Sequence, residues 1–117
     1  MITTKLNKDK MSEFYNVLSQ DLFEKVNYKT PFDGILAVLE KGKRSEPHAH
    51  HETEIFILLS GTGSIGNKTE SEKMEIGNVY FSPPFENHWL ENEGEDDLVF
   101  ISMWWNIESN LSTSLDE

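Results

Sequence analysis

The sequence predicts one all-β domain with a helical segment at its N-terminus, and three observations favour this fold class. The chain has 117 residues, which is enough for one compact domain and little more. From Pro31 onward, short apolar runs alternate with turn residues, a pattern typical of antiparallel strands. No repeat of fixed period is present, which argues against a propeller or a solenoid. Roughly seven or eight short strands then leave two economical folds, a sandwich and a closed jelly-roll barrel.

The region before Pro31 predicts an amphipathic helix. Apolar residues recur three and four positions apart within residues 9–26, the spacing of one helix face. We expect this helix to pack on the barrel or on a second subunit. The predicted organisation of the single domain, 1–117, is therefore a helical extension at 1–30, a β-barrel at 31–107 and a polar tail at 108–117.

Four apolar runs are the clearest strand candidates. They are residues 35–39, 55–59, 79–81 and 98–105. Glycine-containing turns follow the first two runs, and an acidic turn precedes the last. Pro83 and Pro84 close the third run, because proline cannot donate to a sheet ladder.

Composition excludes several classes of function. The net charge is −11, from 21 acidic and 10 basic residues, so a nucleic acid or an anionic membrane surface is a disfavoured partner. There is no cysteine, which excludes disulfides, thiolate metal sites and thiol nucleophiles. No apolar run is long enough to span a bilayer and no signal peptide is recognisable, so we expect a cytoplasmic protein.

Four candidate metal ligands lie in two short parts of the chain. His48 and His50 are two residues apart, so on a strand their imidazoles point to the same face. Glu54 begins the next apolar run, and His88 follows the two prolines. Three imidazoles and one carboxylate suit one divalent Fe, Mn, Ni, Co or Zn ion and leave positions open for water or substrate. The alternative is that His48 and His50 are structural, hydrogen-bonded residues of a barrel without metal.

These residues belong to two longer motifs. Residues 42–54, continuing to Gly61, resemble the first motif of the cupin superfamily, and residues 77–92, with Pro83, His88 and Asn92, resemble the second. The resemblance covers 42–92 and implies a cupin-type double-stranded β-helix, which is a jelly-roll barrel. It also implies the same four metal ligands and a homodimer.

Two positions within these motifs need separate treatment. The second motif normally has glycine where this chain has Phe85, so we expect a different turn there, shaped by Pro83 and Pro84. Asn92, at the last position of the motif, is interpreted as a hydrogen-bonding or turn residue rather than a ligand.

Side-chain alternation predicts which residues line the pocket. Phe56 and Leu58 share the parity of Glu54 and are expected to face the cavity. Either Tyr80 or Phe81 should point inward, and so should one of the last two tryptophans; the sequence does not decide which. The predicted pocket-lining residues are Phe56, Leu58, Phe81 and Trp104.

Metal chemistry on a small polar metabolite is the predicted function. A redox-inert ion would favour an isomerase, epimerase, lyase or decarboxylase that works by Lewis-acid catalysis, and ferrous iron would favour a dioxygenase. The acid–base candidates are Tyr80 and His51, although alternation points His51 away from the ligands. The alternative is a non-catalytic cupin that binds a metal or small ligand as a sensor or accessory protein. The sequence leaves the substrate, the reaction, the native metal and the pathway open.

An apolar stripe supports the expected homodimer. Ile55, Ile57 and Leu59 alternate with the inward residues of their strand and therefore point outward. Such a stripe requires a cover, and a second subunit is the expected one.

Overall fold

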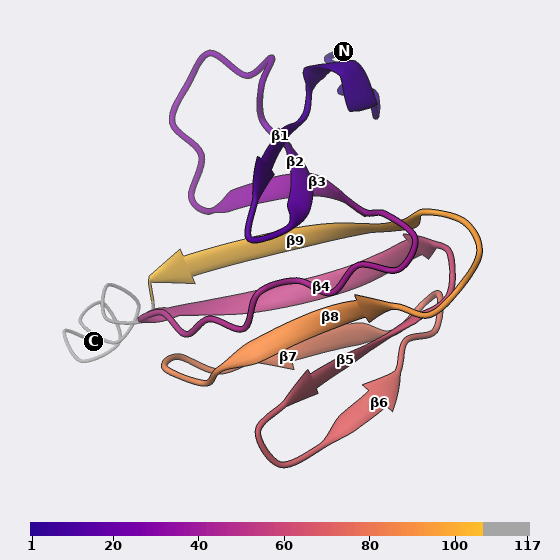
Figure 1. The fold of residues 1–117 in the computed structure, drawn as a ribbon. Helices are drawn as coiled ribbons and strands as arrows, with labels where there is room; N and C mark the ends of the chain where they lie inside the picture. The colour runs from indigo at the N-terminus through magenta and orange to yellow at the C-terminus, as the bar shows by residue number, and fades with distance from the viewer. Residues whose placement is uncertain (107–117) are drawn as a thin grey trace, which may run out of the picture.

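The computed structural model describes residues 1–106 and is almost entirely β; the predicted polar tail at 108–117 lies outside the described residues. Within this part of the chain, one short 3₁₀ helix precedes the strands (Figure 1). The elements are η1 (Lys8–Lys10), β1 (Ser12–Phe14), β2 (Val17–Asp21), β3 (Asp33–Leu39), β4 (Glu52–Ser60), β5 (Gly63–Asn67), β6 (Ser71–Lys73), β7 (Val79–Ser82), β8 (His88–Asn92) and β9 (Leu98–Asn106).

The strands form two antiparallel sheets. The larger sheet has the order β1-β2-β3-β9-β4-β7 and the smaller one has the order β6-β5-β8. The last strand, β9, therefore lies between β3 and β4, and strands far apart in the sequence become neighbours. In Figure 1 the hairpin of β1 and β2 lies at one end of the molecule, while β5 and β6 lie at the other. This arrangement agrees with the predicted jelly-roll fold.

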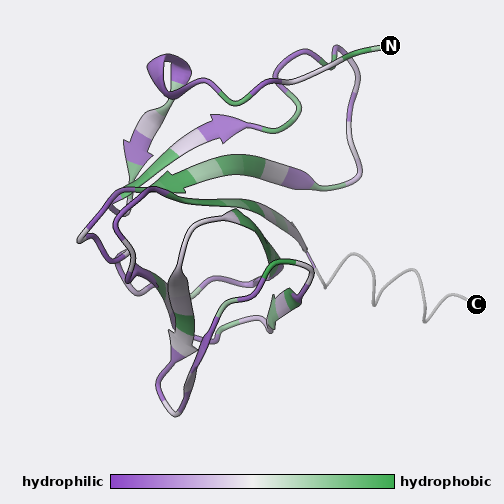
Figure 2. Ribbon diagram, turned by 90° about the vertical axis from the view of Figure 1, so that its right-hand side faces the viewer, coloured by the Kyte–Doolittle hydropathy of each residue, from purple (hydrophilic) through white to green (hydrophobic). Residues whose placement is uncertain are grey.

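Alternation along the central strands defines the core between the sheets. On β9, Leu98 and Phe100 are buried on the inner face, whereas Ile101 and Met103 alternate with them and lie on the outer face. Leu39 of β3 is also fully buried, directly across from Leu98. Figure 2 shows that the hydrophobic stretches lie within the strands and that the connecting loops are mostly hydrophilic. Each such buried apolar side chain stabilises the fold by about 1.5–3 kcal/mol.

The predicted N-terminal helix is wrong. The only helical part of this region is the 3₁₀ turn η1, and residues 12–21 form the hairpin of β1 and β2. Tyr15 and Asn16 join the two strands with φ of 54° and 67°, values that belong to a two-residue type I′ turn. β2 pairs with β3 along its free edge, for example Leu18 with Val38. Sheet pairing to an available edge thus overrides the helical spacing of the apolar residues.

An irregular segment, residues 43–50, runs beside β8 and extends the smaller sheet. The Ser45 N–H donates to the carbonyl of Leu90 at 2.8 Å, and the N–H of Asn92 donates to the carbonyl of Lys43 at 3.0 Å. His48 and His88 form a further antiparallel bridge. The segment that carries two candidate ligands is therefore held by backbone bonds against the strand that carries the third histidine.

The four strands predicted from the apolar runs are present in the structure. β3, β4, β7 and β9 contain the four predicted runs, each extended by one to three residues at one or both ends. Asn92 is a turn-stabilising residue, because its side-chain amide donates to the carbonyls of Leu39 and Asp96. In residues 1–106 no helix is long and apolar enough to cross a membrane.

Candidate metal centre

The four predicted ligands meet at one point inside the domain. One ligand atom from each of His48, His50, Glu54 and His88 can be chosen so that all four atoms lie within 4.8 Å of one another. His88 and Glu54 are 4% and 7% exposed, while the other two histidines are half-buried. The group therefore has a buried side, formed by β4 and β8, and an accessible side, formed by the segment before β4.

Each histidine is oriented in the same way by a backbone carbonyl two residues away. Nδ1 of His48 lies 3.2 Å from the carbonyl oxygen of Glu46, and Nδ1 of His50 lies 2.9 Å from that of Glu52. Nδ1 of His88 lies 3.1 Å from the carbonyl oxygen of Glu86. A carbonyl oxygen only accepts, so each Nδ1 carries the proton. In the neutral rings Nε2 is then left as the free lone pair, which is the form that binds metal.

Both carboxylate oxygens of Glu54 contact polar groups that stabilise its ionised form. Oε1 lies 2.9 Å from Nε2 of His50 and 3.1 Å from Nε2 of His88, and Oε2 accepts a hydrogen bond from Oγ of Ser102. Burial alone would raise the pKa of Glu54, but its contacts with His88, Ser102 and His50 outweigh burial and lower the pKa below its usual range. The carboxylate is therefore charged at neutral pH.

The three histidines do not share one electrostatic environment. Burial lowers the pKa of His48, so this imidazole is neutral at neutral pH. Burial also opposes the charge on His88, yet contact with Glu54 outweighs it and raises the pKa of His88. Without a metal, contact with Glu54 therefore favours the protonated form of His88.

The donor set fits a divalent metal ion. Nε2 of His88 is buried and makes no hydrogen bond, even though Oε1 of Glu54 is 3.1 Å away. With Nδ1 of His50 donating to a carbonyl, Nε2 of the neutral ring and Oε1 of Glu54 are two acceptors 2.9 Å apart. Two facing lone pairs need a proton or a cation between them. Three imidazole nitrogens and one carboxylate around that point are suitable ligands for a divalent transition-metal ion.

A cavity of about 900 Å³ opens beside these residues, and two of the four predicted lining residues reach it. Phe56 and Trp104 both line it. Leu58 has the predicted inward direction but packs in the core, 2% exposed, without lining the cavity. Phe81 points outward and is 62% exposed, because Tyr80 and Ser82 take the inward positions of β7. The expectation that Phe81 lines this pocket is therefore wrong.

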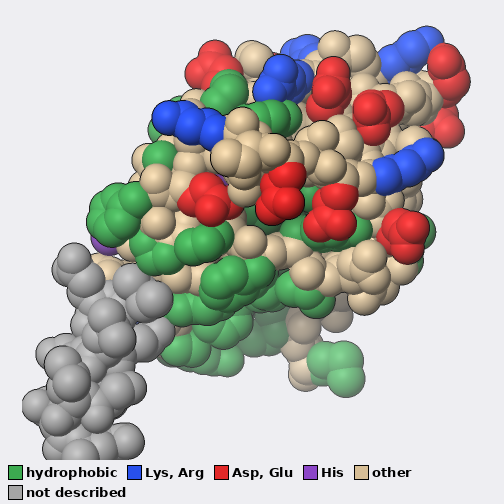
Figure 3. Space-filling view, turned by 90° about the horizontal axis from the view of Figure 1, so that it is seen from below, with side chains coloured by type: hydrophobic (Ala, Val, Ile, Leu, Met, Phe, Trp, Pro, Cys, Tyr) green, Lys and Arg blue, Asp and Glu red, His purple; other side chains and the backbone are tan. Residues whose placement is uncertain are grey.

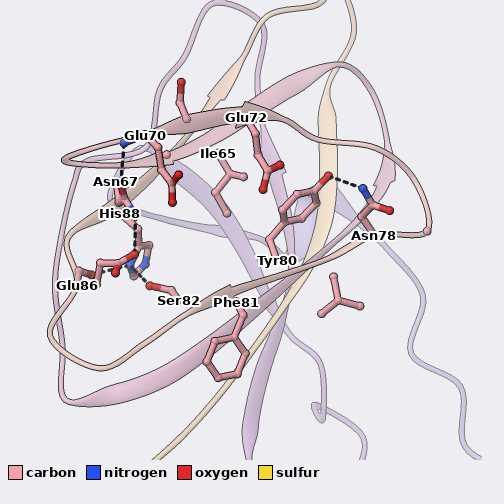
Figure 4. Close-up of a pocket in the computed structure, with 14 residues that line it drawn as sticks. Ile65, Asn67, Glu70, Glu72, Asn78, Tyr80, Phe81, Ser82, Glu86 and His88 are labelled. Carbon is pink, nitrogen blue, oxygen red and sulfur yellow. Dashed lines mark hydrogen bonds between the residues drawn. The ribbon is translucent and has the colours of Figure 1, made fainter.

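The two acid–base candidates do not lie in this cavity. The hydroxyl of Tyr80 accepts hydrogen bonds from the N–H of Glu75 at 2.7 Å and from the side-chain amide of Asn78 at 3.3 Å. Figure 4 shows this hydroxyl pointing towards Asn78 and away from His88, in a second pocket beside β7 that His88 also lines. His51 is exposed and does not line the cavity. Tyr80 thus closes a turn, and His51 is a surface residue.

Two residues of the site were missed by sequence reasoning. Tyr15 stacks on His48 with ring centroids 4.6 Å apart and planes inclined by 11°. The apolar spacing predicts a helix at Tyr15, whereas Asn16, a residue that tolerates positive φ, is the sequence signal for a turn. Ser102, which bonds Glu54, shares the parity of Trp104 on β9 and could have been found by alternation.

The turn at Phe85 also differs from its prediction. Phe85 has φ of 65°, the left-handed conformation that the glycine of the motif would take with less strain. Its N–H donates to the carbonyl of His50 at 2.7 Å. The prolines therefore do not impose a different turn; the geometry expected for glycine is kept, with a phenylalanine in it.

Comparison with known proteins identifies the family. The model of the Cupin domain matches residues 35–104. A Cupin 2 conserved barrel domain protein from Salinispora arenicola superposes with a TM-score of 0.83 at 23% identity, covering 100% of this chain and 98% of the other. A protein from Photorhabdus luminescens gives 0.83 at 28% identity, with 100% and 99% covered. A predicted oxalate decarboxylase from Thermotoga maritima gives 0.71 at 22% identity, with 86% and 97% covered.

The family match spans more than half of the chain and contains all four candidate ligands, and the matched structures share the fold over nearly its whole length. This chain is therefore a single-domain member of the cupin family.

Proposed function

We propose that this cupin is a metal-dependent enzyme that holds one divalent ion through His48, His50, Glu54 and His88. The observation that carries the proposal is the buried Nε2 of His88, which makes no hydrogen bond and faces the other three donor atoms. An unsatisfied polar atom at such a depth costs about 1–3 kcal/mol, which a bound ion would remove. Its substrate is expected to be a small molecule in the adjoining cavity.

The metal ion would supply the chemistry, and the side chains of the protein would position the ion and the substrate. A bound divalent ion supplies Lewis-acid stabilisation of negative charge on a substrate oxygen, or, if it is iron, redox chemistry with dioxygen. The chain itself keeps Glu54 ionised through Ser102 and orients the imidazoles through their Nδ1 atoms. Phe56 and Trp104 provide apolar walls that limit water. These features support an isomerase, epimerase, lyase, decarboxylase or dioxygenase; the likeness to the predicted oxalate decarboxylase extends to the fold alone.

Elemental analysis tests the metal centre directly. The protein is purified without chelator or affinity metal, beside His50→Ala and His88→Ala. About one equivalent of Fe, Mn, Ni, Co or Zn in the wild type, lost in both variants, is the expected result. The identity of the metal then selects the assay: oxygen consumption for iron, and isomerase or lyase assays for a redox-inert ion. Absence of metal, with no thermal stabilisation by any of these ions, would contradict the proposal.

A second candidate is a non-catalytic cupin that binds a metal or a small ligand. The position of Tyr80 and His51 favours it, since neither predicted acid–base residue lines the cavity. Saturable ligand binding by the metal-loaded protein, with the ligand recovered unchanged after long incubation, would distinguish this candidate from the enzyme.

We further propose that the protein is a homodimer that associates through the outer face of its larger sheet. Half-buried or exposed apolar residues of β4, β7 and β9 share this face: Ile55, Ile57, Leu59, Val79, Phe81, Ile101, Met103 and Trp105. Figure 3 shows hydrophobic side chains gathered along one side of the molecule, apart from most of the charged ones. A continuous apolar face of this kind is typical of an interface. A cytoplasmic location remains an expectation.

A further inference from the structure

Carboxylates and one aromatic ring lie side by side on the inner face of the larger sheet. The strand register places Asp33 of β3 directly across from Trp104 of β9, and Trp104 directly across from Glu54 of β4. Side chains paired in this way have Cβ atoms about 5 Å apart. Glu52 precedes Glu54 by two residues and shares its face. The ring of Trp104 is therefore bordered by acidic residues on both neighbouring strands.

Acidic groups predominate among the charged side chains that line the cavity. Besides Glu54, four carboxylates line it, and Lys10 is the one lysine or arginine among its described lining residues. The four are Asp21, Glu24, Asp33 and Glu52. Within residues 1–106, none of these four carboxylates forms an ion pair with a lysine or arginine. The lysine–carboxylate pairs of this part of the chain involve other carboxylates. Even with a divalent ion at the centre, the cavity walls remain net negative.

Aromatic rings also line the cavity, and they interact differently with cations and anions. Phe14 and Tyr15 of the N-terminal hairpin line the cavity together with Phe56 and Trp104. An aromatic face attracts an organic cation by about 0.5–2 kcal/mol, depending on how far the cation is desolvated. The same faces offer nothing to an anion, and the carboxylates repel one.

One buried polar atom on the cavity wall has no hydrogen-bond partner, which indicates a bound ligand. His88, which is 4% exposed, lies on the cavity wall with Nε2 unpartnered. We infer that the cavity takes an amine-bearing molecule with an apolar body, its cationic group beside Trp104 and Asp33, in preference to a carboxylate or a phosphate. This inference rests on the proposed function, because it names the substrate class of that site.

Three probes with one ring and different charge test the inference by calorimetric titration: benzyltrimethylammonium, benzyl alcohol and benzoate. The quaternary nitrogen has no lone pair, so its binding cannot come from coordination to a metal. With metal-loaded protein, we expect benzyltrimethylammonium to bind about tenfold more tightly than either other probe. Its affinity should fall as salt is added, because the attraction is electrostatic.

Two variants locate the cation. Asp33→Asn and Trp104→Leu are each expected to weaken benzyltrimethylammonium binding about three- to tenfold without changing the metal content. Glu93→Gln is the matched control, since Glu93 is an exposed carboxylate that does not line the cavity and its loss changes the net charge equally. It should leave the affinity unchanged. Asp33 is exposed, so its variant remains informative if Trp104→Leu fails to fold.

The outcomes separate this inference from the metal proposal. Tighter binding of benzoate than of the cation by metal-loaded protein would overturn the inference and leave the metal centre standing. Equal weakening by Asp33→Asn and Glu93→Gln would also overturn it, because the effect would then be one of overall charge. Cation binding by wild type that takes up no metal would support the inference and overturn the metal centre.

Discussion

His48 and His88 face each other across one antiparallel bridge and exchange both backbone hydrogen bonds. The N–H of His48 donates to the carbonyl of His88 at 3.3 Å, and the N–H of His88 donates back at 3.1 Å. Two ligands that are far apart in the sequence are thus fixed by the backbone itself. Two further backbone bonds hold the segment 43–50: the N–H of Glu46 donates to the carbonyl of Tyr15, and the N–H of Phe85 donates to the carbonyl of His50. The spacing of the ligands is therefore set before any metal binds.

Replacing Phe85 by glycine should stabilise the metal-free protein. Phe85 has φ of 65°, which costs a side chain about 1–2 kcal/mol, and its ring is 71% exposed and contributes little burial. Glycine removes this strain but gains entropy when unfolded, so we expect a net increase of about 0.5–1 kcal/mol in the free energy of unfolding. Urea denaturation measures it. Phe85→Ala is the control, because it removes the ring and keeps the strain; an equal gain in both variants would contradict the backbone explanation.

Tyr15→Gly should weaken metal binding with little change in stability. Tyr15 also has a positive φ, of 54°, and its ring stacks on His48. Glycine should relieve the strain, but it adds entropy to the unfolded chain and removes the stack, so the denaturation midpoint of the metal-free protein should change little. Loss of the stack, worth about 0.5–1.5 kcal/mol, should weaken metal binding roughly two- to tenfold.

Calorimetric titration with Zn²⁺ measures this affinity, and Tyr15→Phe is the conservative control that keeps the ring. Its affinity should equal that of the wild type. If Tyr15→Gly binds Zn²⁺ as tightly as the wild type does, the stacked ring does not orient His48.

The outcome at the N-terminus shows where sequence periodicity fails. Apolar residues three and four apart fit a helix face, but the same residues can also alternate on two short strands once a turn separates them. The turn at Tyr15 and Asn16 was hidden because tyrosine rarely takes a positive φ. The free edge of β3, which β2 covers, is a property of the folded sheet and has no local signal.

The ligands were predictable for the opposite reason. His48, His50 and Glu54 lie close in sequence, so strand geometry alone limits how far apart they can be, and the motifs add His88. The predicted inward direction of Phe81 is wrong because strand parity next to two prolines cannot be counted from either side; Tyr80 takes the inward position instead. The acidic neighbours of Trp104 come from two other strands, β3 and β4, so only the register brings them together.

Ser102→Ala should weaken metal binding more than Ser82→Ala. Ser102 is the donor to Oε2 of Glu54, and its loss leaves a buried carboxylate oxygen without that partner. Ser82 contacts Nδ1 of His88 at 3.0 Å, but the carbonyl of Glu86 accepts from the same atom. Loss of a residue that orients a metal ligand typically lowers metal affinity by about 10- to 100-fold. We expect an effect of about this size for Ser102→Ala. Competition with a chromophoric chelator measures both variants; a larger effect of Ser82→Ala would contradict this ranking.

Metal affinity should rise with pH through the range in which His88 loses its proton. Contact with Glu54 raises the pKa of His88 despite its burial, so the metal-free site keeps a proton above pH 6.5, where free histidine loses it. The lowered pKa of Glu54 means that this carboxylate stays ionised and does not compete. Each proton displaced makes the affinity rise at most about tenfold per pH unit.

Titrations with Zn²⁺ at pH 6, 7 and 8, in buffers of different ionisation enthalpy, give both the affinity and the number of protons released. The slope should decrease once the pH passes the raised pKa of His88. An affinity that does not change between pH 6 and pH 7 would show that His88 holds no proton for the metal to displace.

A charge at Ile57 should separate the proposed dimer. Ile57 lies on β4 in the middle of the apolar outer face, between Val79 of β7 and Ile101 of β9. A glutamate there would be buried without a partner in the interface, at a cost of several kcal/mol. We therefore expect Ile57→Glu to be monomeric, by size exclusion with light scattering, at concentrations where the wild type is dimeric. Ile76→Glu is the control, since Ile76 is exposed in the loop before β7. Retained uptake of metal shows that the variant is folded, and an unchanged dimer would place the interface elsewhere.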